Sequence, residues 1–99
     1  MRAPRLVVAF IPSAAVMTRI FAHRGCTRDC PENTRSAFAT ARSCGVDGVE
    51  FDVQLSRDSV AMVIHDTRVD RTCNGVGAVS DLTYKELRVL DAGSWFDVR

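Results

Sequence analysis

Apolar and polar residues alternate along the middle of the chain, over residues 46–56. The apolar side chains fall at every second position, and Glu50 and Asp52 lie between them. A period of two is typical of a β-strand with two different faces. Apolar runs over residues 18–25 and 59–67 each carry one histidine near their end, and they predict two further strands.

The segment between the first two predicted strands carries helix signals. Residues 31–45 place apolar side chains at helical spacing. Asn33 or Thr34 is the expected N-cap, because both side chains can accept a hydrogen bond from the first turn. Gly45 is the expected stop. We therefore predict a helix that returns the chain from the first strand to the second.

A second helix is expected over residues 84–90. Thr83 precedes it and Glu86 follows three residues later, which is the spacing of a capping box, while Leu82 and Leu87 can form a hydrophobic staple. The resulting order is strand, helix, strand, strand, helix. This order predicts an α/β fold with parallel strands whose polar residues gather at their carboxyl ends.

Residues 1–18 read as an N-terminal extension that packs as a cap on the domain. Two arginines followed by an apolar run make the segment weakly leader-like, but Pro12 interrupts that run. The run is also shorter than the roughly twenty residues of a membrane span. We therefore expect the folded domain to occupy residues 19–99.

Composition places the chain among ordinary globular domains. Its 99 residues are 46% hydrophobic and 25% charged, which is enough for one small core. The net charge of +1 offers no basic face for nucleic acid. The 4 cysteines match no disulfide or zinc pattern, so free thiols are expected. The cytoplasm is favoured slightly over secretion, and membrane association stays open.

Glu50 and Asp52 are the first candidates for chemistry. As residues i and i+2 of a strand they share one face, where their carboxylates can hold one divalent cation. Hard oxygen ligands favour Mg²⁺ or Ca²⁺ over Zn²⁺. The alternative is that both acids lie on the solvent-facing side of a half-exposed strand.

The 2 histidines of the chain, His23 and His65, both lie at predicted strand ends. Two histidines on either side of a carboxylate pair suggest an acid and a base that flank a substrate. Arg24 follows His23 and offers a planar fork suited to phosphate oxygens. These residue types together favour phosphoryl transfer, because the site must stabilise charge on phosphorus oxygens.

Residues 73–81 are expected to form a glycine-rich loop. Asp66 is placed to orient His65, and Asp70 with Arg71 reads as a local ion pair that braces the loop. The glycines of this loop indicate a tight turn rather than a phosphate-binding loop, because no Gly-Lys-Ser or Gly-Lys-Thr follows them.

Six motifs, in order, resemble the N-terminal part of the glycerophosphodiester phosphodiesterase family: HRG, PENT, GVDGVEFDVQLSRDS, HD, DRTCNGVG and LTYKELRVLDAG. The resemblance covers residues 19 to about 96. It implies a (β/α)₈ barrel and the metal-dependent hydrolysis of a glycerophosphodiester to glycerol 3-phosphate and an alcohol. The implied cofactor is Mg²⁺ or Ca²⁺.

The resemblance also assigns roles to individual residues of this chain. The implied site consists of the acid/base residues His23 and His65, the phosphate-binding residue Arg24, the metal ligands Glu50 and Asp52, and the neighbouring groups Glu32, Asn33 and Asp66. A further metal-binding glutamate and a phosphate-contacting lysine are implied beyond the matched region. The substrate is thus expected to be a small glycerophosphodiester, with no nucleic-acid partner.

A (β/α)₈ barrel takes about 250 residues, so the chain would form an incomplete TIM barrel with roughly the first three strands and two helices. A partner would be needed to complete that barrel, and the isolated chain is expected to be inactive. One alternative is a non-catalytic remnant that binds a phosphate, a cation or another protein. Another is a related barrel phospholipase of the sphingomyelinase-D or phosphoinositide-specific type, against which the PENT and DRT segments argue.

Overall fold

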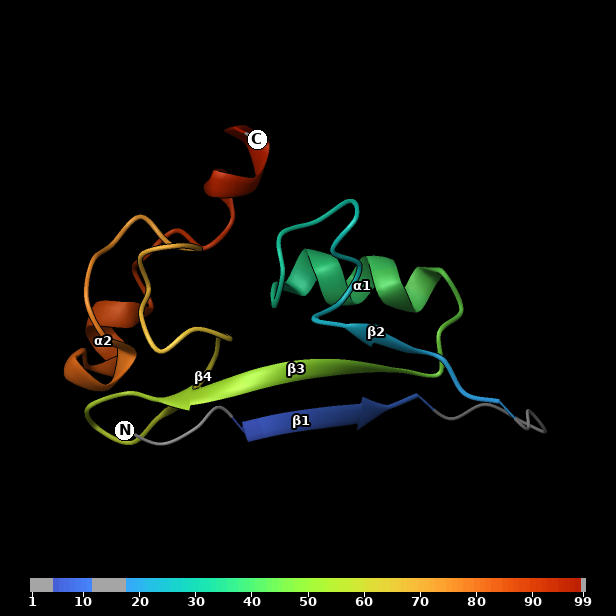
Figure 1. Cartoon of the computed structure of the whole chain (residues 1–99), viewed down its shortest axis with the longest axis horizontal. Helices are drawn as coiled ribbons and strands as arrows, with labels where there is room; N and C mark the ends of the chain where they lie inside the picture. Colours follow the sequence, from blue (N-terminus) through green and yellow to red (C-terminus); the bar gives the residue numbers. More distant parts are fainter. Residues whose placement is uncertain (1–4, 12–17, 99) are drawn as a thin grey trace.

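The computed structural model describes residues 5–11 and 18–98. In chain order its elements are β1 (Arg5–Phe10), β2 (Phe21–His23), α1 (Arg35–Ser43), β3 (Gly48–Leu55), β4 (Ala61–Val63), the 3₁₀ turn η1 (Val79–Asp81), α2 (Tyr84–Leu87) and the 3₁₀ turn η2 (Ser94–Val98). The predicted order of strands and helices is present, with β1 added before it (Figure 1). Residues 1–4 and 12–17, which make up much of the expected N-terminal extension, lie outside the described residues, and the expected boundary after residue 18 stays a prediction.

Strand β3 is the centre of an open, four-stranded sheet. Strand β2 runs parallel to β3, whereas β1 and β4 are antiparallel to it. The expectation of a parallel sheet is therefore wrong for two of the three neighbours of β3. Residues 56–60 alone join β3 to β4, and so short a connection permits a hairpin but not the crossover that parallel strands require.

Strand β1 occupies one edge of β3, while β2 and β4 follow one another along the other edge. Residues 48–50 of β3 pair with both β1 and β2, so those two strands lie on opposite edges. Val53 pairs with both Arg5 of β1 and Val63 of β4, which places β4 opposite β1 as well. The carboxyl ends of β2 and β4 consequently point toward each other along one edge of β3.

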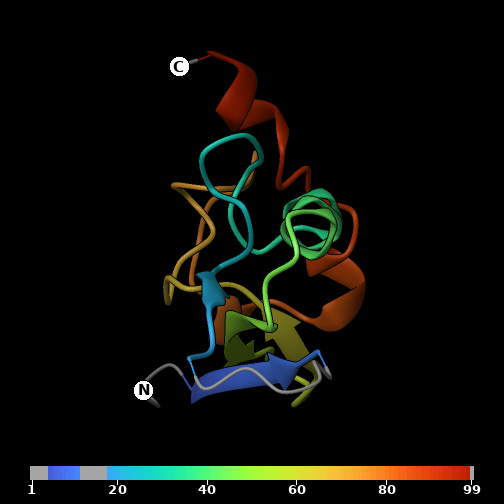
Figure 2. The ribbon, with the colours of Figure 1, turned by 90° about the vertical axis from the view of Figure 1, so that its right-hand side faces the viewer.

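The apolar core lies between β4, η1 and α2, and a smaller apolar contact holds α1 against β3. The core consists of the buried residues Val69, Val79 and Leu87, with Met62, Ile64, Cys73, Leu82 and Leu90 packed against them. On α1, Ala37 and Ala41 are buried, and the ring centroids of Phe38 and Phe51 lie 5.8 Å apart. The two helices therefore pack at different ends of β3, as Figure 1 shows. Figure 2, which looks along the sheet, shows both helices above β1.

Local sequence signals set both helix starts as predicted. The Oγ1 atom of Thr34 accepts a hydrogen bond from the N–H of Ala37 at 3.3 Å, so Thr34 rather than Asn33 caps α1. Thr83 and Glu86 form the expected capping box at the start of α2. Each cap satisfies backbone donors that the first helical turn leaves free.

Helix α2 ends at Leu87 rather than at Leu90 as expected. The reason lies in the pairing of Asn74 with Asp91. The N–H of Asp91 donates to Oδ1 of Asn74 at 2.8 Å, and the N–H of Asn74 donates to the carbonyl oxygen of Asp91 at 3.1 Å. These two bonds hold the chain against the preceding loop and end the helix early.

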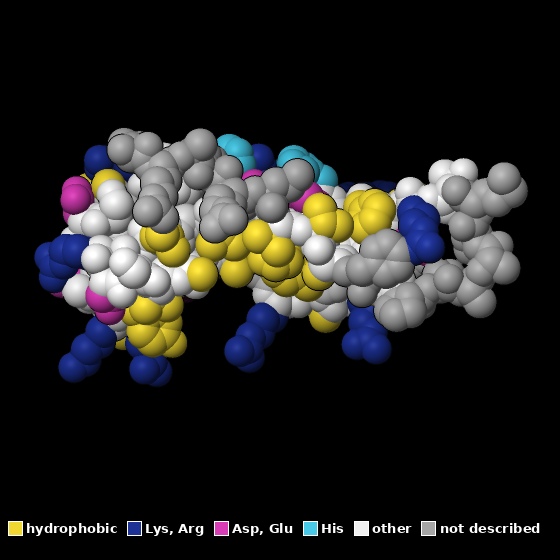
Figure 3. Space-filling model, turned by 90° about the horizontal axis from the view of Figure 1, so that it is seen from below, with side chains coloured by type: hydrophobic (Ala, Val, Ile, Leu, Met, Phe, Trp, Pro, Cys, Tyr) yellow, Lys and Arg dark blue, Asp and Glu magenta, His cyan; other side chains and the backbone are white. Residues whose placement is uncertain are grey.

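Large apolar side chains stay exposed around the sheet. Val8, Ile20, Phe21 and Val63 are all at least 39% exposed. Figure 3 shows hydrophobic side chains gathered across the underside of the molecule. Exposed apolar strands of this kind mark surfaces that another element ordinarily covers. Within the described residues, no helix is both long and apolar enough to cross a membrane.

Candidate active site

The carboxyl ends of β2 and β4 meet beside the acidic pair of β3. His23, the last residue of β2, pairs in register with Glu50. The N–H of Ile64, directly after β4, donates to the carbonyl oxygen of Asp52 at 3.0 Å. The residues that follow these two strands therefore begin on either side of the two acids.

The acidic face of β3 is buried rather than solvated. Glu50 is 8% exposed and Asp52 is 6% exposed, and Gln54 farther along the same face is buried as well. The alternative of a solvent-facing strand is therefore wrong. Because buried carboxylates are costly without donors or positive charge, the groups around this face must compensate them.

Arg24 supplies much of that compensation through a left-handed turn. Its φ is 58°, and that of Gly25 is 85°. The N–H of Arg24 donates to the carbonyl oxygen of Glu50 at 2.8 Å and lies 3.2 Å from its Oε2 atom. The guanidinium lies 3.2 Å from Oδ2 of Asp52 as an ion pair and donates to Oε2 of Glu32 at 3.1 Å. Arg24 thus contacts three carboxylates, including the two expected metal ligands.

The PENT segment packs directly on this turn. The N–H of Asn33 donates to the carbonyl oxygen of Arg24 at 3.0 Å, and its Nδ2 atom donates to Oδ2 of Asp52 at 3.2 Å. Asn33 also has a left-handed backbone, with φ 57°, which asparagine tolerates better than most residues. Glu32 and Asn33 therefore lie beside Arg24 and Asp52, and their role as neighbouring groups of a site stays a prediction.

His23 and His65 reach the site from its two sides. The Nε2 atom of His23 lies 3.5 Å from Oε2 of Glu50, and the ring is largely exposed. The Nδ1 atom of His65 lies 2.8 Å from Oδ1 of Asp66. The orienting role of Asp66 stays a prediction. The carbonyl oxygen of His65 accepts a hydrogen bond from Nε2 of Gln54 at 2.8 Å. A buried side chain of β3 thereby fixes the backbone that carries this histidine.

Arg71 is a member of the site that the sequence prediction missed. Its NH1 and NH2 atoms donate to the two carboxylate oxygens of Glu32 at 2.6 and 3.2 Å. Its Nε and NH2 atoms donate to the two oxygens of Asp66 at 2.8 and 2.9 Å. The expected pair of Asp70 with Arg71 is wrong, because Asp70 pairs with Arg68 at 3.2 Å instead.

Ion pairs and hydrogen bonds connect the two histidines without a break. The path runs through His23, Glu50, Arg24, Glu32, Arg71, Asp66 and His65. Asp52 and Asn33 join the path at Arg24. All eight residues expected in the site therefore belong to one connected network, and Arg71 closes the part of it next to His65.

Electrostatics lower the pKa of two acids of this network, Asp66 and Glu32. Hydrogen bonds from Arg71 hold the pKa of the Asp66 carboxyl well below its usual value of 3.8. Burial alone would raise the pKa of Glu32, but hydrogen bonding and charge from Arg71, helped by the charge of Arg24, lower it overall. The same carboxylates raise the pKa of Arg71, with Asp66 the larger cause. Arg71 is therefore a permanent cation between two anions.

Two buried oxygens in the site accept no hydrogen bond: Oε1 of Glu50 and Oδ1 of Asn33. Buried polar atoms are normally satisfied, so an unpaired carboxylate oxygen fits a position where a cation or donor binds. Glu50 and Asp52 match a hard divalent cation in ligand type. Within the described residues, however, no group of three or more His, Cys, Asp and Glu side chains is arranged to hold a metal. The chain thus offers part of a ligand set.

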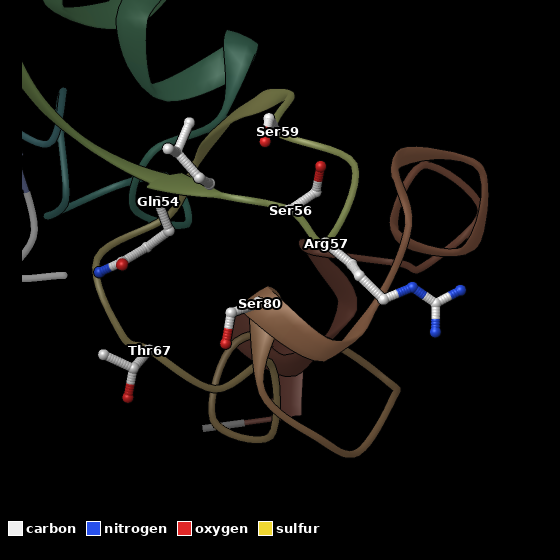
Figure 4. Close-up of a pocket in the computed structure, with 7 residues that line it drawn as sticks. Gln54, Ser56, Arg57, Ser59, Thr67 and Ser80 are labelled. Atoms are coloured by element: carbon white, nitrogen blue, oxygen red, sulfur yellow. The ribbon is translucent and has the colours of Figure 1, made fainter. Parts of the chain in front are cut away.

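Cavities of different size and lining lie along β3, and one of them borders His65. A cavity of about 40 Å³ next to His65 is lined by Glu32, Asn33 and Thr72 among others, and it has room for about one water molecule. A larger cavity of about 380 Å³ lies at the far end of β3 and is lined by Gln54, Leu55, Ser56, Arg57, Ser59, Thr67 and Ser80. The Arg57 side chain extends away from Gln54 and Thr67 there (Figure 4). Neither histidine lines the larger cavity.

Two buried acids, an arginine and two histidines thus belong to one network beside the parallel pair of β2 and β3. A model of the glycerophosphoryl diester phosphodiesterase family matches residues 23–99. The chain belongs to this family.

Known relatives agree with the family match. The glycerophosphodiester phosphodiesterase of Caldanaerobacter subterraneus subsp. tengcongensis is 52% identical over 79 residues, covering 80% of this chain and 32% of the relative. The crystal structure of the glycerophosphodiester phosphodiesterase from Agrobacterium tumefaciens has a TM-score of 0.80 at 49% identity, covering 84% of this chain and 36% of that one. A phosphodiesterase of Oleispira antarctica, solved in complex with the product sn-glycerol-3-phosphate, has a TM-score of 0.76 at 39% identity and covers 80% of this chain and 32% of that one.

The chain spans about a third of the length of these relatives. It aligns with part of their structures, and its own sheet is open. The expected family membership is therefore confirmed, and the described residues form an open mixed α/β sheet that matches part of the family's structures.

Proposed function

We propose that this chain forms the histidine-bearing N-terminal third of a metal-dependent phosphodiesterase that hydrolyses glycerophosphodiesters to glycerol 3-phosphate and an alcohol. The observation that supports it best is the meeting of β2 and β4 at a buried acidic pair. That geometry brings both histidines, Arg24 and two carboxylates to one side of β3. The Oleispira relative, solved with glycerol 3-phosphate, supports the same substrate class.

In this proposal His23 and His65 are the acid and the base. Asp66 is ionised and can only accept, so Nδ1 of His65 carries the proton that joins the two residues. The Nε2 atom is then free to take a proton from an attacking hydroxyl or, once protonated, to give one back. The attacking oxygen forms a new bond to phosphorus, the bond to the departing alkoxide breaks, and the other histidine protonates that alkoxide.

Arg24, Glu50 and Asp52 would hold the phosphate and the metal ion. The Oε1 atom of Glu50 is the unpaired hard ligand, and Asp52 is its neighbour on the same face. A bound Mg²⁺ or Ca²⁺ would stabilise negative charge on the phosphate oxygens. Arg24 already neutralises the acids in this structure, and its guanidinium would offer the phosphate a second positive centre.

Completion of the barrel is the second part of the proposal. In a (β/α)₈ barrel every strand has two parallel neighbours. Strand β3 has a parallel neighbour, β2, on one edge, but antiparallel β1 occupies the other. The remaining strands would therefore have to replace β1 on that edge and cover the exposed apolar residues around it.

The direct test is a completed enzyme. The whole chain is joined to the part of the Agrobacterium tumefaciens phosphodiesterase that it does not match, and release of glycerol 3-phosphate from glycerophosphocholine is measured with Mg²⁺ or Ca²⁺. Sphingomyelin and phosphatidylinositol serve as competing substrates. Turnover of glycerophosphocholine alone supports the proposal. Turnover of either lipid instead, or cation and phosphate binding with no turnover at all, would reject it in favour of a related phospholipase or a non-catalytic binding module.

A further inference from the structure

The loop between β4 and η1 carries a cation, Arg71, that binds the carboxylate partner of one of the two histidines. Arg71 donates to both oxygens of Asp66 and to both oxygens of Glu32, at distances between 2.6 and 3.2 Å. Glu32 in turn accepts from Arg24 at 3.1 Å. Arg71 therefore connects the part of the network around His65 and Asp66 with the part around Arg24 and Glu32.

We infer that Arg71 is a positioning residue that holds Asp66 in place, fixes the ring of His65 through Asp66, and ties Glu32 and Arg24 to the same frame. This inference rests on the proposed function, because His65 needs a fixed ring only if it transfers a proton. Nothing in the family match or in the names of the relatives assigns a role to Arg71.

The His65–Asp66 pair needs such an anchor because its two members are adjacent in the chain. Both side chains are partly exposed, at 39% for His65 and 29% for Asp66, so water competes for each of them. An isolated pair at this exposure contributes little and leaves both side chains free to rotate. Two parallel bonds from a planar guanidinium fix the carboxylate in one orientation, and the carboxylate then selects the Nδ1–H form of the imidazole.

The shape of arginine matters here as much as its charge. A guanidinium can donate to two carboxylates along two of its edges, as it does to Glu32 and Asp66. A lysine ammonium is a compact point charge without that planar fork. Arg71→Lys should therefore keep the charge but lose the bridge, and it should behave more like Arg71→Gln than like the unmodified chain.

The test reads the tautomer of His65 directly. In the ¹⁵N-histidine-labelled 99-residue chain, long-range ¹H–¹⁵N spectra distinguish Nδ1–H from Nε2–H imidazole, and His23→Gln assigns the two signals. We expect His65 to be a single Nδ1–H tautomer in the unmodified chain and an exchanging mixture in Arg71→Gln and Arg71→Lys. A His65 signal that keeps the single tautomer in both variants would overturn the inference.

Arg68→Gln is the matched control. Arg68 is on the same loop and also forms a two-bond pair with a carboxylate, that of Asp70, but it is outside the network. Its removal should leave the His65 signal unchanged. Where Arg71→Gln unfolds the chain, as amide dispersion would reveal, Asp66→Ala provides the test instead. That variant removes the acceptor for Nδ1 together with the partner of Arg71 and should release the tautomer, and a retained single tautomer would again reject the inference.

Activity of the completed enzyme separates this inference from the proposed function. Removal of supporting residues around a site typically costs about 10–100-fold in activity, so we expect kcat to fall by that factor in Arg71→Lys with KM nearly unchanged. Arg68→Gln should stay within about twofold, as surface substitutions usually do. If the completed enzyme is inactive but His65 is a single Nδ1–H tautomer, the proposed phosphodiesterase function is rejected and the positioning role of Arg71 is not. An active parent whose Arg71→Lys variant keeps its kcat would reject the positioning role alone.

Discussion

Arg24 and Glu50 are joined twice by one backbone amide: the N–H of Arg24 donates to the carbonyl oxygen of Glu50 at 2.8 Å and lies 3.2 Å from its Oε2 atom. The first bond continues the parallel ladder of β2 and β3. The second fixes the carboxylate of Glu50, the same residue whose carbonyl oxygen accepts the first bond. The strand register therefore places the acid and the arginine together before any ligand binds. The turn that makes this possible depends on Gly25.

Gly25→Ala should destabilise the fold and displace His23 and Arg24. The residue has φ 85°, and an added Cβ would lie 2.7 Å from backbone and side-chain atoms of Ala37 in α1. A left-handed alanine costs about 1–2 kcal/mol, and overpacking about 1–3 kcal/mol more. We expect the free energy of unfolding in urea to fall by the sum of these two costs.

Gly45→Ala is the control for this prediction. Gly45 also has a positive φ, 77°, but an added Cβ would meet no atom within 4 Å. Its loss of stability should be limited to the backbone cost of about 1–2 kcal/mol. Equal losses for the two alanine variants would show that the contact of Gly25 with α1 does not hold the turn.

His23→Ala and His65→Ala should each abolish turnover in the completed enzyme while cation binding persists. General acid or base catalysis contributes typically about 10²–10⁴-fold, so each variant should lose activity in that range. The measurement pairs kcat with Mn²⁺ binding followed by electron paramagnetic resonance. Near-normal turnover in either variant would reject its acid/base role, and lost binding in His23→Ala would indicate that its contact with Glu50 supports the metal site instead.

Glu50→Gln should raise the cation concentration needed for half-maximal activity and for binding. The substitution keeps the size of the side chain but removes the charge that Oε1 offers to a metal ion. A lost ligand charge weakens affinity, and we expect an increase of roughly 10–100-fold in the required concentration. Asp29→Asn removes the same charge from an exposed loop residue and should leave the cation requirement unchanged. An unchanged requirement in Glu50→Gln would remove Glu50 from the ligand set.

Local sequence signals predicted the helix starts, because caps depend on residues close in sequence. The eight candidate site residues lie in one network, but their roles stay a prediction. The direction of β4 was predicted wrongly. Two successive apolar runs are compatible with an antiparallel hairpin as well as with a parallel crossover, so the apolar pattern alone does not give the direction. Even so, the two strand ends meet as expected. Antiparallel β4 ends next to Asp52 because it shares one edge of β3 with β2.

Arg71 shows why the rest could not be predicted. Its partner Glu32 is 39 residues away in the sequence, and Asp66 is 5 residues away in a loop without a period. The adjacent Asp70 offered a simpler pair, yet neighbouring residues in a bent loop point in different directions. A long-range charge bridge of this kind depends on tertiary packing, which no local pattern records.

Acid should destabilise the chain through Glu32 and Asp66. Folding lowers the pKa of both carboxyls, so their contribution is fully present above their usual values of 4.5 and 3.8 and is lost as the pH falls through the lowered ones. Between about pH 6 and about pH 3 we expect the free energy of unfolding in urea to fall by on the order of 1 kcal/mol from these two groups. Arg71→Gln should show a smaller fall over the same range, because Arg71 lowers both pKa values. An equal fall would assign the acid sensitivity to other carboxyls.

Removal of residues 1–18 should raise the activity of the completed enzyme. Strand β1 pairs with β3 from Arg5 opposite Val53 to Phe10 opposite Gly48, along the edge where a barrel needs its next parallel strand. Strand β1 and the next barrel strand cannot pair with this edge of β3 at the same time. Strand β1 must therefore leave before the barrel closes, and the loss of its pairing with β3 opposes closure. We expect turnover of glycerophosphocholine to increase when the domain begins at residue 19.

Substitution of Val7 by proline, which removes a backbone donor from β1, should act in the same direction without shortening the chain. Equal or lower turnover in both variants would show that β1 belongs to the working fold and that the domain boundary lies before it.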